Sequence, residues 1–136
     1  MESISIEAKI LNEYRTVAVV GVSPNPERPS YRVLSYLGEH GYTVFPVNPL
    51  AREIGGQASY PNLIAIPARV EVVDIFRRSE EVGPIVEEAI EIGAKAVWMQ
   101  EGVIIEEAAS KAREAGLLVV MDKCMRKEHL HLTERG

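Results

Sequence analysis

Short apolar runs alternate with amphipathic stretches along this chain of 136 residues. Five mostly apolar runs predict buried strands, at residues 16–20, 43–47, 70–76, 96–99 and 117–121. Four stretches with apolar positions three or four apart predict helices, at residues 7–14, 30–40, 79–92 and 105–115. Buried strands that alternate with amphipathic helices are typical of a parallel sheet covered on both faces. The pattern therefore predicts an α/β, Rossmann-like, doubly wound fold.

Capping residues and length add detail to this fold. Ser30 is the expected N-cap of the helix at 30–40, and Gly41 its C-terminal stop. Counting strands from the N-terminus, we expect the sheet order 3-2-1-4-5, with helices on both faces. A chain of this length fits a single domain spanning residues 1–136.

Charge and composition narrow the class of partner. The net charge of −5 argues against nucleic acid, whose binding requires a basic surface. The N-terminus lacks the apolar core of a signal peptide, and the longest apolar run, at 117–121, is too short to cross a bilayer. The single cysteine excludes an internal disulfide framework. We expect a cytoplasmic protein without a membrane or nucleic-acid partner, either monomer or homodimer.

Positive charge gathers after the predicted strands. Eight of the fifteen lysines and arginines follow strand ends: Arg28, Arg32, Arg52, Arg77, Arg78, Lys123, Arg126 and Lys127. Many of the glutamates instead fall on the predicted helices, where we expect them to solvate outer surfaces. Ligands of open parallel sheets bind beyond the carboxyl ends of the strands. The charge pattern therefore predicts a site for a polyanion at that edge.

The junction after the first strand carries the sharpest signal. Gly21 lacks a Cβ, so we expect a ligand's phosphates to approach its backbone closely. Ser23 and Ser30 offer hydroxyl groups, and the following helix offers free N–H groups at its N-terminus. The segment lacks GxGxxG spacing, and the second strand ends in Val47-Asn48-Pro49 without a ribose-binding acid. An NAD-dependent dehydrogenase is therefore disfavoured, and no Walker-type loop is present.

At these junctions the sequence resembles the CoA-binding protein family, which is related to the N-terminal domain of the succinyl-CoA synthetase α subunit. The matching segments are VAVVGVS at 17–23, RPSYRV at 28–33, VFPVNP at 44–49, VDIFRR at 73–78, VWMQEGV at 97–103 and VMDKC at 120–124. The resemblance implies a free-standing Rossmann domain that binds coenzyme A and carries no attached catalytic domain.

The resemblance also implies a set of site residues. The diphosphate would contact Gly21, Ser23, Arg28 and Ser30. The cofactor-binding residues would also include Val22, Tyr31, Arg32 and Cys124. The adenosine and its 3′-phosphate would contact Val47, Asn48, Pro49 and Arg52, with Ile75, Phe76 and Arg77 on the adenine side. The wall toward the pantetheine arm would comprise Met99, Gln100 and Gly102. Ala51 stands near the position of a synthetase lysine, with Arg52 beside it.

The remaining reactive residue types give weaker signals. His40 lies next to the helix-ending Gly41, and His129 and His131 lie in a polar tail; neither CxxC nor HxxxH spacing occurs, so we expect no metal site and no catalytic residue. Cys124 lies among basic residues, which can lower the pKa of a thiol. One hypothesis is a mixed disulfide between Cys124 and CoA; the alternative, which we favour, is a buried and inert cysteine.

Three functions remain open, and we favour the first, which is not enzymatic. The first is non-enzymatic binding of CoA or an acyl-CoA, as a carrier. The second is a subunit of a CoA-dependent enzyme that needs a partner for catalysis. The third is a sensor whose affinity for a protein partner changes with CoA, since such coupling is reciprocal.

Overall fold

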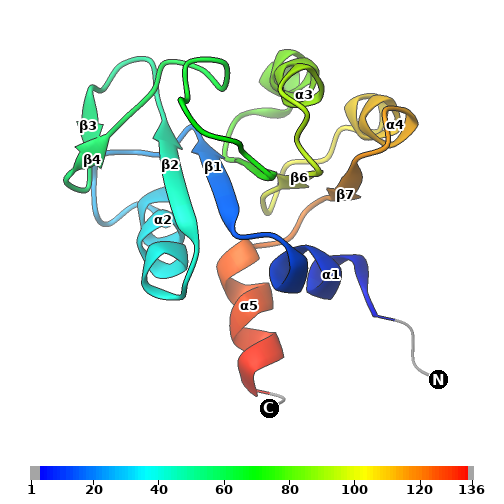
Figure 1. Cartoon of the computed structure of the whole chain (residues 1–136), viewed down its shortest axis with the longest axis horizontal. Helices are drawn as coiled ribbons and strands as arrows, with labels where there is room; N and C mark the ends of the chain where they lie inside the picture. Colours follow the sequence, from blue (N-terminus) through cyan, green and yellow to red (C-terminus); the bar gives the residue numbers. More distant parts are fainter. Residues whose placement is uncertain (1–3, 135–136) are drawn as a thin grey trace.

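Five parallel strands form the central sheet in the computed structural model, which describes residues 4–134 (Figure 1). Their order across the sheet is β2-β1-β5-β6-β7. Their bounds are β1 (Thr16–Val20), β2 (Thr43–Val47), β5 (Val72–Ile75), β6 (Ala96–Met99) and β7 (Leu118–Val120). A small antiparallel hairpin of β3 (Glu53–Ile54) and β4 (Gln57–Ala58) follows β2. The predicted α/β class and the five parallel strands are confirmed.

The predicted strand order is wrong. When the five strands of the central sheet are counted from the N-terminus, the observed order is 2-1-3-4-5. The predicted order placed the third strand beside the second, whereas β5 pairs with β1. Pro46 in β2 gives the physical reason. Its carbonyl accepts a hydrogen bond from the Tyr60 N–H, on the side of β2 away from β1. On that side proline has no N–H to donate, so β2 suits the edge of a sheet and not an internal position.

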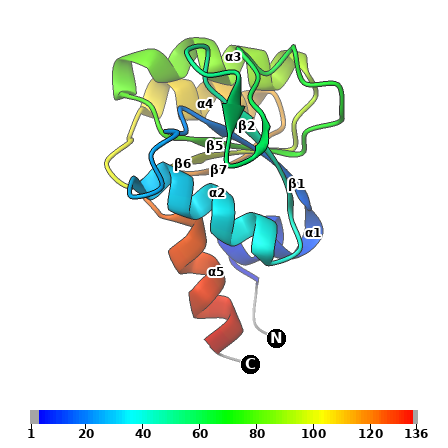
Figure 2. The ribbon, with the colours of Figure 1, turned by 90° about the vertical axis from the view of Figure 1, so that its left-hand side faces the viewer.

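Helices cover both faces of the sheet, as expected. Helices α1 (Ile6–Glu13), α2 (Pro29–Glu39) and α5 (Met125–Glu134) lie on one face. The short 3₁₀ turn η1 (Ser79–Glu81), α3 (Val82–Glu91) and α4 (Glu106–Glu114) lie on the other side, as Figure 2 shows. The C-terminal segment around His129 is therefore a helix and not the polar tail expected. No helix within residues 4–134 is long and apolar enough to cross a membrane.

Each face of the sheet buries its own apolar cluster. Val73 and Ile75 of β5 pack toward α3 and α4, whereas Val72 packs toward α1, α2 and α5. This division follows from the alternation of side chains along a strand. Trp98 is fully buried in the second cluster, where its indole N–H donates to the Lys123 carbonyl at 2.9 Å. The two clusters fix the sheet between its helices.

The N-cap of α2 lies two positions before the predicted one, and this difference matters for the site. Arg28 occupies the N-cap position and makes no side-chain capping bond to any residue that the structure describes, and Pro29 is the first helical residue. Proline is favoured there because its fixed φ fits the helix. A backbone N–H at this position would have no partner within the helix, so the N–H that proline lacks is not missed. Ser30 is therefore not the N-cap. Its buried hydroxyl oxygen instead accepts a hydrogen bond from the Ser23 N–H at 2.9 Å.

Candidate functional site

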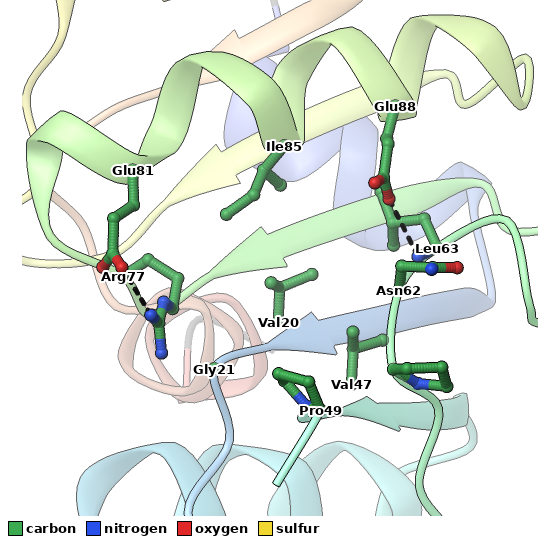
Figure 3. Close-up of a pocket in the computed structure, with 11 residues that line it drawn as sticks. Val20, Gly21, Val47, Pro49, Asn62, Leu63, Arg77, Glu81, Ile85 and Glu88 are labelled. Atoms are coloured by element: carbon green, nitrogen blue, oxygen red, sulfur yellow. Dashed lines mark hydrogen bonds and ion pairs between the residues drawn. The ribbon is translucent and has the colours of Figure 1, made fainter.

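A cavity of about 230 Å³ lies where β1, β2 and β5 end, beneath α3 (Figure 3). Its lining residues are Val20, Gly21, Val47, Pro49, Pro61, Asn62, Leu63, Arg77, Glu81, Ile85 and Glu88. The cavity therefore occupies the edge at which ligands of parallel sheets bind. Of the residues that the sequence suggested, it brings together Gly21, Val47, Pro49 and Arg77.

The cavity is apolar where the strands end and polar along its helical wall. Val20 and Val47 project into it from β1 and β2 (Figure 3). Glu81, Ile85 and Glu88 are spaced by four and three residues, so they share one face of the helical segment above it. Glu81 and Glu88 belong to the glutamates that were expected to solvate outer helix surfaces, and their place in the cavity wall corrects that expectation.

Gly21 supports the site for a reason other than the one expected. Its φ is +85°, and a Cβ there would lie 2.5 Å from the Phe76 carbonyl oxygen and 2.6 Å from the Arg77 Cδ. The space beside Gly21 is thus filled by the protein's own chain, not left open for phosphates. The missing Cβ allows the stem of Arg77 to cross the β1 end closely.

Arg77 is held in place by Glu81. The guanidinium Nη2 donates to Glu81 Oε1 at 2.6 Å, across one helical turn of sequence. This hydrogen bond lowers the pKa of the Glu81 carboxyl. The two side chains are 42% and 41% exposed, so an incoming ligand can reach both. Arg77 therefore presents a positive charge at the cavity mouth, partly neutralised by its neighbour.

The opposite end of the helical wall is also hydrogen-bonded. Glu88 Oε1 accepts from the Leu63 N–H at 3.0 Å, which ties the loop after β4 to α3. Pro61, Asn62 and Leu63 come from this loop, which the sequence analysis left unassigned. The signal that could have found them is weak, because irregular loops carry no periodicity that points to a face.

The loop between β1 and α2 is braced by its own polar groups. Besides the bond to Ser30, the Ser23 oxygen accepts from the Asn25 N–H at 3.0 Å. Asn25 in turn accepts from the Glu27 N–H at 3.0 Å. Each serine oxygen accepts a backbone bond, which leaves its hydroxyl proton free to donate. The exposed Arg28 lies at the end of this loop.

Asn48 joins two of the loops at the strand ends. Its Nδ2 donates to the Val22 carbonyl at 2.9 Å, and its Oδ1 accepts from the Leu50 N–H at 2.8 Å. Both ends of the amide are thus used within the protein. Asn48 positions the loops after β1 and β2 relative to each other.

Several suggested site residues lie apart from the cavity. Val22, Ile75 and Met99 are fully buried in the apolar clusters, and Phe76 is half-buried. Tyr31 and Arg32 line a separate open groove of about 330 Å³ between α2 and the start of α5, with Arg126. Arg52 is exposed after β2.

The residues suggested for the pantetheine side lie around the loop after β6. The buried Gln100 accepts a bond from the Met125 N–H at 3.4 Å, and the exposed Gly102 donates its N–H to Asp122 at 2.7 Å. Cys124 is only 6% exposed and belongs to the apolar cluster on the α5 side of the sheet. A mixed disulfide with CoA would require this thiol to leave the core.

His40 and His129 lie in an aromatic cluster between α2 and α5, and neither lines the cavity. The Tyr36 hydroxyl and His129 Nδ1 share a hydrogen bond of 2.7 Å, and the rings of Tyr36 and His40 stack at 3.9 Å. Burial lowers the pKa of His129, and the nearby His40 and Arg15 add to this effect. Among residues 4–134 no group of three His, Cys, Asp or Glu side chains is placed to hold a metal.

Asp74 is a buried acid that the sequence analysis did not single out. It lies in β5 between Val19 and Trp98, has no exposed surface, and neither carboxylate oxygen has a hydrogen-bond partner within residues 4–134. Burial raises the pKa of this carboxyl well above its ordinary range. Asp74 is therefore neutral over a wider pH range than an exposed acid.

Comparison with known proteins assigns this chain to a family. The family model described as "CoA binding domain" matches residues 15–130. A hypothetical protein from Pyrococcus horikoshii OT3 is 42% identical, and its structure superposes with a TM-score of 0.92 over 98% of this chain and 99% of that one. YneT of Bacillus subtilis, described as uncharacterized, is 36% identical over 89% of this chain and 90% of its own.

A more distant relative is a larger enzyme. Acetate–CoA ligase (ADP-forming) I of Archaeoglobus fulgidus is 35% identical over 76% of this chain, but the match covers only 14% of the ligase. The similarity thus concerns one portion of that protein. The family model's match, over residues 15–130, includes all the strands described above and the helices from α2 to α4. It leaves out α1 and the end of α5. The chain belongs to the CoA-binding domain family.

Proposed function

We propose that this protein binds coenzyme A or an acyl-CoA at the carboxyl edge of its sheet and releases it unchanged. The observation that carries the proposal is the convergence of Arg77, the β1–α2 loop and the strand-end cavity at one edge. A guanidinium and hydroxyl donors beside an apolar recess suit a ligand with phosphates at one end and a base at the other.

The charges of the cavity wall indicate which part of the ligand it takes. Glu81 and Glu88 contribute two carboxylates against the single guanidinium of Arg77. A phosphate inside the cavity would be repelled, whereas the exocyclic amino group of adenine could donate to a carboxylate. The apolar surfaces of Val20, Val47 and Ile85 suit the faces of a base. In this proposal the base enters the cavity, and the phosphates lie outside it.

The phosphates then lie along the β1–α2 loop. This loop offers the Ser23 hydroxyl and Arg28, and it runs next to Arg77. Guanidinium groups pair with phosphate oxygens through two parallel N–H bonds. Binding without turnover, as a carrier or a sensor, is part of the proposal. In support of this, Glu81 and Glu88 are already hydrogen-bonded, to Arg77 and to the Leu63 N–H, and the thiol of Cys124 is buried.

A panel of ligands tests this function. Thermal unfolding is measured with CoA, acetyl-CoA, dephospho-CoA, NAD and ATP at equal concentration. A ligand that binds the native state raises the melting temperature by mass action. We expect CoA and acetyl-CoA to give the largest shifts, with unchanged ligand recovered afterwards by chromatography. A larger shift with NAD, or hydrolysis of acetyl-CoA by the chain alone, would contradict the proposal.

A further inference from the structure

Arg77 and Glu81 separate two hollows at the strand ends. The cavity beneath α3 shares these two residues with a second, open hollow of about 440 Å³, which is lined by Phe76, Arg77, Arg78 and Glu81. The ion pair between them is therefore the boundary between the hollows. Its position means that a ligand spanning both must displace or share this ion pair.

The two partners are held from different parts of the fold. The stem of Arg77 is packed across Gly21 at the end of β1. Glu81 occupies the N-cap position of α3, in line with Ile85 and Glu88. The guanidinium is therefore held near the cavity mouth, and the Glu81 carboxylate reaches it from the start of α3.

The geometry sets up a competition for one guanidinium. Nη2 of Arg77 already donates to the Glu81 carboxylate. A phosphate that binds Arg77 through two parallel N–H bonds needs an edge of the same group. Every phosphate bound by Arg77 must therefore overcome an anion that belongs to the protein.

We infer that Glu81 is a competing anion that lowers the affinity of the site for CoA by occupying Arg77 when the ligand is absent. This inference rests on the proposed function. Glu81 thereby sets how strongly charged a ligand must be to engage Arg77, and it acts as a determinant of affinity and selectivity. The lowered pKa of Glu81 agrees with a carboxylate that stays charged at neutral pH.

A double-mutant cycle tests the competition. The dissociation constant for CoA is measured by calorimetry for the wild type, Glu81→Gln, Arg77→Ala and the double variant. We expect Glu81→Gln to bind CoA about two- to five-fold more tightly, the range set by exposed ion pairs. We expect the double variant to bind as Arg77→Ala does, because the gain requires the guanidinium. Thermal unfolding confirms that each variant is folded.

Glu80→Gln is the matched control. Glu80 is the neighbouring residue, but it lines the outer groove between α3 and α4. We expect its neutralisation to leave CoA affinity unchanged. Equal gains in Glu80→Gln and Glu81→Gln, or a gain that persists without Arg77, would overturn the competition in favour of a general charge effect.

The remaining outcomes separate the two proposals. If the wild type binds CoA but Glu81→Gln binds equally or more weakly, Glu81 positions Arg77 for the ligand and the competition is wrong, while the proposed function stands. If neither the wild type nor Glu81→Gln binds CoA, the proposed function fails and this inference fails with it.

Discussion

The Cδ of Arg77 lies 2.6 Å from the point where a Cβ on Gly21 would be placed. A residue at the end of β1 and a residue just after β5 are therefore matched in shape. The Phe76 carbonyl lies at 2.5 Å from the same point, so backbone as well as side chain fills this space. The candidate site depends on this contact, because it directs the guanidinium toward the cavity mouth.

Gly21→Ala should destabilise the protein through both the clash and the backbone conformation. A positive φ costs a residue with a Cβ about 1–2 kcal/mol, and the overlap with Phe76 adds to this cost. Gly102→Ala is the control, since its φ is also +85° but no atom of the described part of the chain lies within 4 Å of the added Cβ. Urea unfolding should show a larger loss for Gly21→Ala; equal losses would mean that the contact with Arg77 and Phe76 relaxes without cost.

Arg77→Ala and Arg28→Ala should each weaken CoA binding by about 1.5–3 kcal/mol, the contribution typical of a hydrogen bond to a charged group. Arg113→Ala, on the exposed surface of α4, is the control and should bind as the wild type does. Calorimetric titration with CoA measures all three. Unchanged affinity in the first two variants would exclude these arginines from the site.

Asp74 should make stability fall as pH rises. In the folded protein its raised pKa keeps the proton on the carboxyl, whereas in the unfolded chain the proton is lost near pH 3.9. Above about pH 3.9 the unfolded state therefore binds fewer protons, and the free energy of unfolding decreases until the folded-state pKa is passed. Asp74→Asn should remove this decrease and be more stable than the wild type at pH 8, as measured by urea unfolding across pH.

His129 should produce the opposite slope. Burial lowers its pKa below the ordinary value of about 6.5. Below this value the unfolded chain takes up a proton that the folded protein takes up only at lower pH, so stability is lost as pH falls through this window. His129→Asn should reduce the change in the free energy of unfolding between pH 7 and 5, as measured by urea unfolding. The control His131→Asn, at an exposed position of the same helix, should leave this pH dependence unchanged.

Cys124 should resist reaction with CoA disulfide in the folded protein, because its side chain is buried with the apolar residues beneath α5. Intact mass should show no CoA adduct after incubation of the native protein, and an adduct once urea exposes the thiol. Rapid addition of CoA to the native protein, absent in Cys124→Ser, would revive the mixed-disulfide hypothesis.

Local patterns predicted the strands and most helices, because periodicity in apolar residues reports which faces are buried. They failed where a long-range contact decides. The place of β5 depends on Pro46, whose missing N–H was visible in the sequence but was not used. The polar character of α5 concealed a helix that is stabilised by contacts with α1 and α2.

The candidate site was predicted in part for the same reason. Strand ends converge in any parallel sheet, so Gly21 and Arg77 could be named from position alone. Glu81 and Glu88 could not, because helix spacing does not tell which polar face turns toward a cavity. The role of Gly21 was also hidden, since only the fold brings Arg77 across it.

Pro46 and Tyr60 also limit how this protein can associate with itself. The Tyr60 N–H donates to the Pro46 carbonyl, and the Tyr60 carbonyl accepts from the Asn48 N–H, so these backbone groups at the end of β2 are already hydrogen-bonded. A strand from another molecule that approached this side of β2 would meet no N–H donor at Pro46. The Pro46 carbonyl and the Asn48 N–H would already be hydrogen-bonded to Tyr60. Pro46 and Tyr60 together therefore disfavour the addition of a strand from another molecule to this end of β2, and with it aggregation through an intermolecular sheet.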